Sequence, residues 1–558
     1  MITTTLAAST YTAETDAVGG SLLVSALVGL IPLLTFFVLL GVLRVKAHLA
    51  ALGSLAVALL VAVLAYGMPV DLALLSATQG AAFGLFPILW IVITAIWLYE
   101  LTVVSGRMED VRAVFSAVGR GDMRVQAMLI AFCFGGLLEA LAGFGAPVAI
   151  TGAMLVALGL PPIRAAVAVL VANTAPVAFG AMAIPITTAG NLTGIPAERI
   201  AEVVGHQTPL LAVWVPLLLL FLVDGVRGVR QAWPIALVTG GVFAVLQWWA
   251  SNYFSYELTD VVAALGGFLA AVVMLRFWGP RTPEDQRSKV TDAGRDLTPR
   301  RVLLGLLPYW LVVIIFSIGK LWRWGVDVPT ALASTDVALQ WPGLYGRLLT
   351  ADGEASTSAV YTFTWLSSPG TMLLITGLIV TVVYSVARDA GREPITLGRG
   401  IGAFFRIIRD MRFAILTIAS VLALSYVMNQ SGQTVAIGTW LAATGAAFAF
   451  LSPILGWIGT AVTGSDTSAN ALFAKLQQTA GQGAGINPEL LVAANTSGGV
   501  VGKLISPQNL TIAASAIGKP GSEPELLRKV VGYSAAMLLF LCVLVYLQST
   551  PVLGWMVD

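Results

Sequence analysis

The strongest constraint on this chain is a pattern of apolar segments that is interrupted in the same way twice. Four landmarks recur in the same order and at almost the same spacing: a turn glycine, an asparagine before a threonine, a second glycine and a proline. They are Gly143, Asn173, Gly180 and Pro185 in the first repeat and Gly464, Asn495, Gly502 and Pro507 in the second. Paired interruptions of this kind indicate a transport site near the middle of a membrane. The alternative is a packing repeat, because membrane helices also favour small residues where they touch.

Composition places the chain in the lipid bilayer. Of its 558 residues, 57% are hydrophobic and 11% are charged, whereas soluble domains have about 25% charged residues. The balance of 31 Lys and Arg against 29 Asp and Glu gives no sign of nucleic-acid binding. The two cysteines and two histidines lie far apart in the chain, so we expect no disulfide, no metal site and no cofactor. Residues 1–17 carry no positive charge, so we expect no cleaved signal peptide.

Apolar runs of spanning length predict an all-α polytopic membrane protein with about twelve transmembrane helices. Ten runs are uninterrupted, at 20–43, 47–67, 83–105, 207–223, 232–249, 257–277, 301–319, 369–388, 404–428 and 529–548. The repeats add two broken spans, at 163–194 and 488–517. Two further apolar segments, 125–160 and 447–480, turn back at Gly143 and Gly464, and we interpret them as re-entrant hairpins. Two amphipathic segments, 108–118 and 434–444, precede the hairpins and are predicted to lie at the membrane surface.

Basic residues cluster in alternate loops, and the positive-inside rule assigns those loops to the cytoplasm. The N-terminus is then outside, the loop 278–300 is cytoplasmic and the loop 320–367 is extracellular. The first hairpin would enter from the cytoplasm and the second from outside, so the two repeats are predicted to be inverted. We expect five regions: scaffold helices 1–105, a first transport half 106–206, scaffold helices 207–403, a second transport half 404–518 and a C-terminal helix 519–558.

Each interruption exposes backbone groups that need partners inside the membrane. Glycines at the first turn allow a sharp reversal, and the helix that follows begins with unpaired N–H groups that favour a carboxylate. The second turn and second break carry hydroxyl and amide side chains that suit a small hydroxy acid. The predicted substrate site therefore comprises Gly143, Phe144, Gly145, Asn173, Thr174, Gly464, Ser465, Thr467, Ser468, Asn495, Thr496, Lys503 and Ser506. For each Ser, Thr and Asn, capping of its own helix is an equal alternative.

Few ionisable residues lie within the repeats. Glu139 precedes the first turn by four residues, and Asp466 lies in the second turn. Either carboxyl could carry a coupling proton, because a carboxyl in a low-dielectric site is readily kept neutral. Lys503, in the second break, could bind a substrate carboxylate or form an ion pair with Asp466. The other charged residues, Arg164, Lys475 and Glu489, lie near predicted membrane ends and are interpreted as snorkelling side chains.

Four motifs carry a resemblance to the L-lactate permease family. They are LEALAGFGAPVA at 138–149, ANTAPVAFG at 172–180, TGSDTSANALF at 463–473 and GGVVGKLISPQN at 498–509. The resemblance implies proton-coupled symport of L-lactate and related 2-hydroxy monocarboxylates, such as glycolate, across a bacterial plasma membrane.

The chain also resembles the wider ion-transporter superfamily, which includes sodium-coupled dicarboxylate carriers. That resemblance implies an elevator movement of a transport domain against a scaffold, often within a homodimer. Two departures favour H+ over Na+ as the coupling ion: Gln508 replaces a proline of the superfamily's Ser/Thr-Pro-Pro-Asn motif, and 143–147 lacks its Ser-Asn-Thr triplet. The alternatives are a sodium-coupled carrier of another organic anion and an anion channel. An enzyme is disfavoured, because the sequence shows no zinc pattern and no nucleophile with a paired base.

Overall fold

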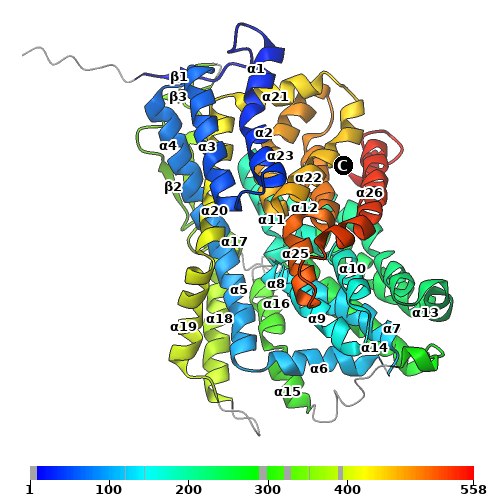
Figure 1. The fold of residues 1–558 in the computed structure, drawn as a ribbon. Helices are drawn as coiled ribbons and strands as arrows, with labels where there is room; N and C mark the ends of the chain where they lie inside the picture. The colour runs from blue at the N-terminus through cyan, green and yellow to red at the C-terminus, as the bar shows by residue number, and fades with distance from the viewer. Residues whose placement is uncertain are drawn as a thin grey trace, which may run out of the picture.

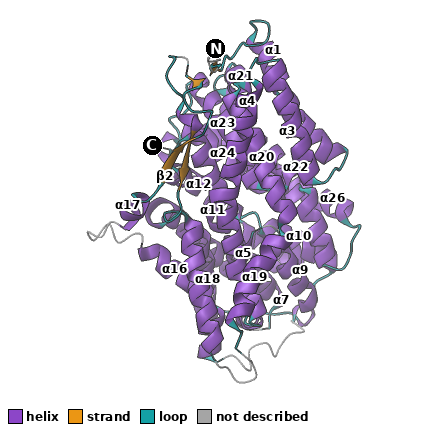
Figure 2. Cartoon of the chain, turned by 90° about the vertical axis from the view of Figure 1, so that its left-hand side faces the viewer, coloured by secondary structure: helices purple, strands orange, loops and turns teal. Residues whose placement is uncertain are grey.

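The computed structural model describes residues 9–119, 121–143, 145–287, 298–318, 328–350, 352–387 and 394–557. Within these ranges the chain is built almost wholly of helices, as Figures 1 and 2 show. Residues 288–297 of the predicted cytoplasmic loop and 319–327 at the start of the predicted extracellular loop lie outside the described residues, as does Phe144.

The N-terminal part of the chain, up to residue 104, is mainly helical. Its helices are α1 (Leu22–Gly29), α2 (Ile31–Phe37), the π-helical η1 (Val38–Val42), α3 (Ala47–Leu64), α4 (Val70–Phe83), the π-helical η2 (Gly84–Leu89) and α5 (Trp90–Val104). Ser21 begins α1 by accepting a hydrogen bond from the Val24 N–H, and Pro32 lies in the first turn of α2, where its missing N–H costs little.

Each repeat folds as a short helix, a hairpin and a broken span. The short helix of the second repeat, Gln433–Ala442, is mostly buried, so the structure does not bear out the prediction that 434–444 lies at the membrane surface. The elements of the first repeat are α6 (Met108–Val118), α7 (Met123–Met128), the π-helical η3 (Leu129–Phe134), α8 (Gly135–Ala142), α9 (Ala146–Leu158), α10 (Pro162–Ala172), the 3-10 turn η4 (Val177–Phe179) and α11 (Gly180–Thr193). The two legs of the broken span are bent by 62°. The second repeat has the same order: α21 (Gln433–Ala442), α22 (Ala447–Thr463), α23 (Asp466–Ala484), α24 (Pro488–Gly502), the 3-10 turn η9 (Lys503–Ile505) and α25 (Pro507–Ala516). Helices therefore form at both predicted hairpins, and both predicted breaks are present.

The remaining elements connect the repeats and close the chain. They are α12 (Ala197–Ala212), α13 (Val215–Trp249), the π-helical η5 (Ala250–Phe254), α14 (Thr259–Phe277), the 3-10 turn η6 (Glu284–Gln286), α15 (Pro299–Gly305), α16 (Leu307–Ile318), α17 (Val328–Ala333), the 3-10 turn η8 (Thr357–Ala359), α18 (Pro369–Val386), α19 (Leu397–Asp410), α20 (Arg412–Gln430), α26 (Glu523–Gln548) and the 3-10 turn η10 (Gly554–Met556). Four short strands pair in two small sheets: β1 (Tyr11–Thr12) with β3 (Leu348–Leu349) in parallel, and β2 (Val337–Gln340) with β4 (Val360–Phe363) in antiparallel.

The count of spans differs from the prediction of twelve. Among the described residues nine helical segments are long and apolar enough to cross a membrane, or up to eleven if each of two bent pairs is one span. The predicted span 83–105 is the second part of a longer helix that begins at Val70, which was missed because Asp71 and Gln79 dilute its apolar pattern. The predicted run 404–428 is two helices, since 404–410 belongs to α19. The predicted run 301–319 bends by 60° between α15 and α16.

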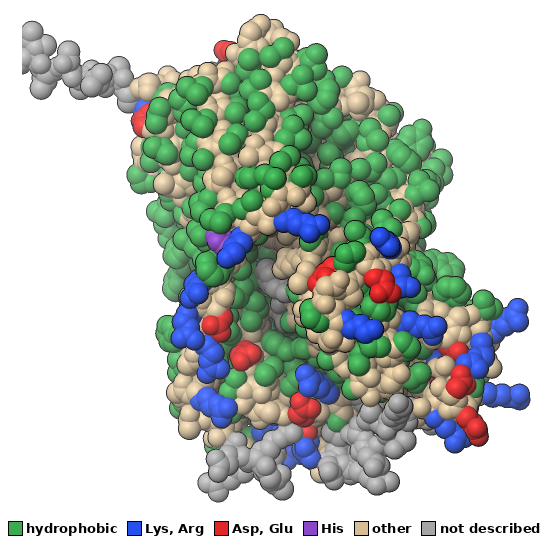
Figure 3. Space-filling model, viewed as in Figure 1, with side chains coloured by type: hydrophobic (Ala, Val, Ile, Leu, Met, Phe, Trp, Pro, Cys, Tyr) green, Lys and Arg blue, Asp and Glu red, His purple; other side chains and the backbone are tan. Residues whose placement is uncertain are grey.

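The helices form two groups, of which the frame helices lie mainly on the left of Figure 1 and the repeats on the right. In the group that we call the frame (α1–α5, α16 and α18–α20), α20 packs on α3 and α4, and α5 packs on α18 and α19. In the group that we call the repeat body (α6–α14 and α21–α26), α11 packs on α23, α9 on α25, and α13 and α14 on the first repeat. The space-filling view in Figure 3 shows a mainly hydrophobic upper half, with charged side chains gathered in the lower half.

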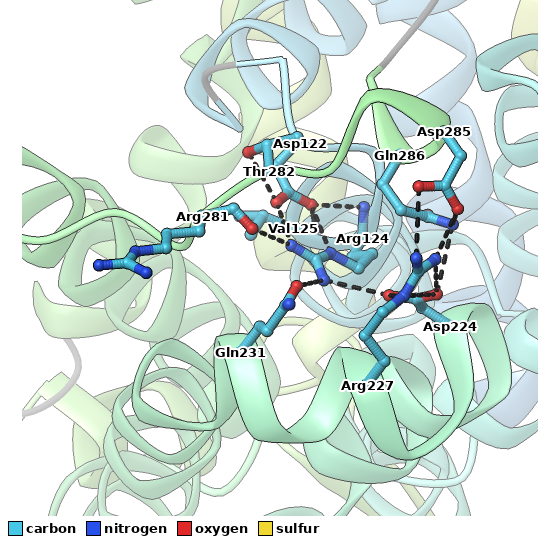
Figure 4. Close-up of polar contacts among 10 residues, drawn as sticks. All are labelled: Asp122, Arg124, Val125, Asp224, Arg227, Gln231, Arg281, Thr282, Asp285 and Gln286. Atoms are coloured by element: carbon cyan, nitrogen blue, oxygen red, sulfur yellow. Dashed lines mark hydrogen bonds and ion pairs between the residues drawn. The ribbon is translucent and has the colours of Figure 1, made fainter.

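A buried ionic cluster anchors the start of the first hairpin to α13 (Figure 4). Arg124 has no exposed side-chain surface, and its guanidinium makes hydrogen bonds to both carboxylate oxygens of Asp122, to Asp224, to Gln231 and to the Arg281 carbonyl. Asp122 also caps α7 through the Arg124 and Val125 N–H groups. All five guanidinium N–H donors can thus be used, which an ammonium group could not reproduce.

The cluster continues to the surface through Arg227. This residue bridges Asp224, at the break in α13, to Asp285 in the loop after α14. Side-chain hydrogen bonds from Arg227 lower the pKa of the Asp285 carboxyl. Arg124 is therefore a structural residue.

We expect Arg124→Lys to lower the melting temperature of the detergent-solubilised protein, because buried acceptors lose donors worth at least about 2 kcal/mol. Arg409→Lys is the matched control, since Arg409 is 75% exposed and its only described ion pair, with Asp410, has a long 3.7 Å separation. Equal melting temperatures for the two variants, measured by thermal unfolding, would contradict the structural role of Arg124.

Candidate functional site

Both hairpin turns and both helix breaks open onto one cavity of about 380 Å³. The first repeat contributes Glu139, Gly143, Val177, Gly180, Ala181 and Pro185, and the second contributes 462–468, Lys503, Pro507 and Gln508. The frame closes the other side with Leu40, Ala47, His48, Phe413, Ala414, Thr417 and Ile418. The space-filling view shows the surface hollowed between the frame and the repeat body, with Lys and Arg side chains around the opening (Figure 3).

An ion pair between the repeats lies in the wall of this cavity. The Lys503 Nζ donates to Glu139 Oε1 over 2.6 Å, and the two side chains are 8% and 4% exposed. The other Glu139 oxygen, Oε2, accepts a 2.9 Å hydrogen bond from the Asn173 amide. Lys503 therefore pairs with Glu139 of the other repeat rather than with Asp466, the partner considered from the sequence.

The backbone of the first break brings α11 close to Glu139. A Cβ at Gly180 would lie 2.9 Å from Glu139 Oε1, so only glycine leaves room for the ion pair at this position. The next three residues, Ala181 to Ala183, have left-handed φ angles of 46°, 60° and 56°. Such angles are costly for alanine, and they swing α11 out of line with α10.

The first hairpin turn is tight and apolar. Gly143 and Gly145 have φ angles of 41° and 88°, which favour glycine, and Ile512 of α25 fills the space where a Gly145 side chain would lie. Of the first N–H groups of α9, that of Ala146 binds the Gly143 carbonyl, and Pro147 has none. The first turn thus offers few donors to an anion, and Phe144 between its glycines lies outside the described residues.

The second hairpin turn is the polar side of the cavity. Gly464 has a φ angle of 76°, and the Ser465 hydroxyl caps α23 by accepting the Ser468 N–H. Asp466 is the first residue of α23 and is 3% exposed. Its Oδ1 accepts a long 3.4 Å hydrogen bond from Thr460, and its Oδ2 has no partner among the described residues. A Cβ at Gly499 would overlap Asp466 Oδ1, so α24 passes directly behind this carboxyl.

Behind the second turn lies a closed hydrogen-bond network. The Asn470 side-chain oxygen accepts from Asn495 and Thr496, at 3.1 and 3.0 Å. Gln477 donates to Asn495 and to the Ser452 carbonyl, and it accepts from the Ser452 hydroxyl. These buried side chains join α22, α23 and α24 into one unit, and satisfied networks of this kind favour a single arrangement.

The predicted site residues fall into two sets. The structure brings Glu139, Gly143, Gly464, Ser465, Asp466, Thr467, Ser468 and Lys503 to the cavity wall. Asn173 supports the wall through Glu139, whereas Gly145, Thr174, Asn495, Thr496 and Ser506 do not line the cavity. Thr174 binds its own helix at the Val171 carbonyl, Ser506 caps α25, and Asn495 and Thr496 belong to the network. For these residues the capping or packing alternative describes what the structure shows.

Sequence reasoning missed a third intramembrane carboxyl. Asp260 of α14 is fully buried, and Gln247 of α13 donates to its Oδ1 over 3.2 Å. Its Oδ2 has no partner within the ranges that the structure describes. The same Gln247 amide donates to the Ala175 carbonyl in the first break. Asp260 interrupts the predicted span 257–277, and an acidic residue inside a span was the signal that could have found it. His48, Thr417 and Gln508 also line the cavity, and no charge or motif in the sequence marked them as site residues.

The family model for L-lactate permease matches residues 25–552. The chain is 40% identical to the L-lactate permease of Bacillus subtilis, covering 98% of this chain and 100% of that protein. It is also 40% identical to the glycolate permease GlcA of Escherichia coli, covering 97% and 98%. Among solved structures, the YdaH transporter of Alcanivorax borkumensis is 14% identical, with a TM-score of 0.45 over 87% of this chain and 88% of that one.

We expect Lys503→Met to destabilise the protein by about 3 kcal/mol or more, because it leaves the Glu139 carboxylate buried without its cation. Adding Glu139→Gln should recover most of the loss, since the amide needs no cation and can still accept from Asn173. Thermal unfolding of the two single variants and the double variant forms a cycle that measures the coupling. Additive losses, with no recovery in the double variant, would show that the two side chains do not form a pair.

Proposed function

The chain belongs to the L-lactate permease family, and on that premise we propose that it is a proton-coupled symporter of L-lactate and related 2-hydroxy monocarboxylates such as glycolate. The family is one of transporters rather than enzymes. The names of the relatives support both acids, because the lactate and glycolate permeases match this chain at the same identity.

One observation carries the proposal: the only described ion pair in the wall of the cavity joins Lys503 of one repeat to Glu139 of the other. A substrate carboxylate that enters the cavity competes with Glu139 for the Lys503 ammonium. When a proton neutralises Glu139, the ammonium is released to the substrate. The proton and the anion therefore bind together, since each removes an obstacle to the other.

The charge of the site accounts for the coupling. In the empty site the Glu139 carboxylate and the Lys503 ammonium cancel, and in the loaded site the ammonium cancels the substrate carboxylate while Glu139 is neutral. An anion bound without a proton would leave one uncompensated negative charge in a buried site, which is strongly unfavourable. Both the loaded site and the empty site can then cross the membrane without a net charge.

Asp466 has a different place in this scheme. No described cation pairs with it, one of its oxygens has no partner, and it is almost fully buried, all of which favour a neutral carboxyl. A neutral Asp466 can donate a hydrogen bond at the second turn. Near it, the hydroxyls of Ser465, Thr467 and Ser468 provide partners for a 2-hydroxyl group.

The arrangement of helices supports an elevator movement. We propose that the repeat body, which contains both hairpins and both broken spans, moves against the frame, with each hairpin re-entrant and the repeats inverted in the membrane. The cavity lies where the two groups meet, so sliding one group past the other would change its access. We also propose that the protein works as a homodimer in the bacterial plasma membrane, with its N-terminus outside.

Radiolabelled L-lactate uptake into proteoliposomes tests the function, with pH and sodium gradients imposed separately. We expect accumulation with an inward proton gradient at zero sodium, saturation with substrate, and competition by glycolate. Accumulation driven by sodium at fixed pH would instead establish the sodium-coupled alternative. Flux that neither saturates nor shows counterflow would establish the channel.

Variants of the two carboxyls identify the proton site. We expect Glu139→Gln to keep lactate exchange between the two sides but to lose accumulation driven by a proton gradient, because the site no longer gains a proton with the anion. Asp466→Asn is the matched comparison and should retain coupled accumulation, since the amide resembles a neutral carboxyl. Lys503→Gln should reduce uptake by roughly 100-fold. The opposite result for the two acids would assign the proton to Asp466.

A further inference from the structure

A second cavity lies farther along the same helices. It has a volume of about 440 Å³ and is lined by the C-terminal end of α11, by Lys475 of α23, by the end of α20 and by the segment 356–360, which contains η8 and the first residue of β4. Its lining is rich in hydroxyl and amide groups, including those of Ser358, Tyr426, Asn429 and Gln430. Among the described residues that line it there is one cation and no Asp or Glu.

Lys475 is that cation. Its Nζ donates to the Gln478 side-chain oxygen over 2.7 Å, and it forms no ion pair with any residue in the described part of the chain. The Gln478 amide in turn donates to the Thr193 carbonyl, which ties α23 to the end of α11. The Lys475 side chain is half-buried and faces this polar cavity. A buried or half-buried cation without a carboxylate favours an anion as its partner.

Both cavities lie between α20 of the frame and α23 of the repeat body. Along α20, Thr417 and Ile418 line the first cavity and Tyr426 lines the second, two helical turns or about 12 Å farther on. Along α23, Ser468 lines the first and Lys475 the second. The turn of α23 between them is closed, because Leu472 and Phe473 are buried there and Phe473 stacks on Phe37 of α2.

We infer that the cavity at Lys475 is a second binding site for the carboxylate, on the access path opposite the cavity at Lys503. This inference rests on the proposed function. The Lys475 ammonium attracts the carboxylate of a small organic acid, and the neighbouring hydroxyl and amide groups replace its water. The anion then stays bound in the cavity at Lys475 until the closed turn of α23 moves away from the frame. Lys475 helps the protein to capture the substrate, whereas Lys503 and Glu139 couple substrate binding to proton binding.

Transport in proteoliposomes of one orientation tests the inference. Lys475→Gln should raise the KM for L-lactate supplied on the 356–360 side about tenfold while changing kcat less than about twofold, and Lys475→Arg should restore the KM. The KM for lactate supplied on the other side should stay unchanged. Lys519→Gln is the matched control, because Lys519 is an exposed lysine in the turn before α26. A wild-type KM for Lys475→Gln from both sides would overturn the inference.

Cysteine labelling gives an independent readout. Both native cysteines are buried, so Ser358→Cys in the second cavity and Thr417→Cys in the first can be labelled selectively with a membrane-impermeant thiol reagent. We expect the two variants to react from opposite sides, and lactate to slow labelling of Ser358→Cys unless Lys475 is also changed to Gln. Labelling from the same side, or protection that does not depend on Lys475, would count against the site.

The labelling experiment also separates the inference from the proposed function. If the wild-type protein takes up no 2-hydroxy acid under any gradient, the proposed function is wrong. A panel of other small carboxylates then tests whether the cavity at Lys475 binds an anion, because a bound carboxylate should protect Ser358→Cys from labelling. Failure of every carboxylate to protect would reject it.

Discussion

The ion pair between Lys503 and Glu139 is the contact on which the rest of the arrangement depends. A charge in the middle of a membrane protein is costly unless a partner is fixed beside it. Here the partner comes from the other repeat, 364 positions away in the chain, so the two repeats must be held together at their breaks for either charge to be tolerated. Gly180 leaves the space that the pair needs, and Asn173 occupies the second carboxylate oxygen. The pair also lies in the cavity wall, so the contact that joins the repeats is the one that an entering anion disturbs.

The polar groups around this pair are of two kinds: some hydrogen-bond one another and hold the helices together, and others keep hydrogen-bonding capacity for a ligand. Away from the cavity, Asn470, Asn495, Thr496 and Gln477 satisfy one another, and the unit of α22, α23 and α24 has little freedom. At the cavity, Asp466 Oδ2 has no partner in the described part of the chain, and the first N–H groups of α23 are only partly capped by Ser465. A binding site needs groups that are unsatisfied until the ligand arrives, held by neighbours that are already satisfied. The breaks provide this division, because an unbroken helix would bond all of its own backbone groups.

Much of this architecture could be predicted from the sequence. Glycine, proline and polar residues inside apolar runs located both hairpins and both breaks, since few other arrangements place such residues at membrane depth. The individual roles were less accessible. Thr174, Asn495, Thr496 and Ser506 have the residue types of ligands, but they cap helices or fill the network, and residue type alone does not separate these uses. The pairing of Lys503 with Glu139 depends on how two distant helices cross, and no local pattern encodes that. Arg124 has partners in α13 and in the segment after α14, so its burial could not be read from its own segment.

The two repeats break their helices in the same way, but they carry different charged residues near the breaks. Lys503 directly follows Gly502, and the residue that directly follows Gly180 in the first repeat is Ala181. Glu139 lies four residues before its turn glycine, and the residue four before Gly464 is Thr460. Each charged member of the pair therefore has a small neutral counterpart in the other repeat. Two copies of the lysine would leave an excess of positive charge in the cavity, and two copies of the glutamate would bring like charges together. In the proposed mechanism a single pair, with one member from each repeat, gives a site that is neutral when empty and neutral when a proton and a carboxylate are bound, and that neutrality would permit a buried site to move across a membrane.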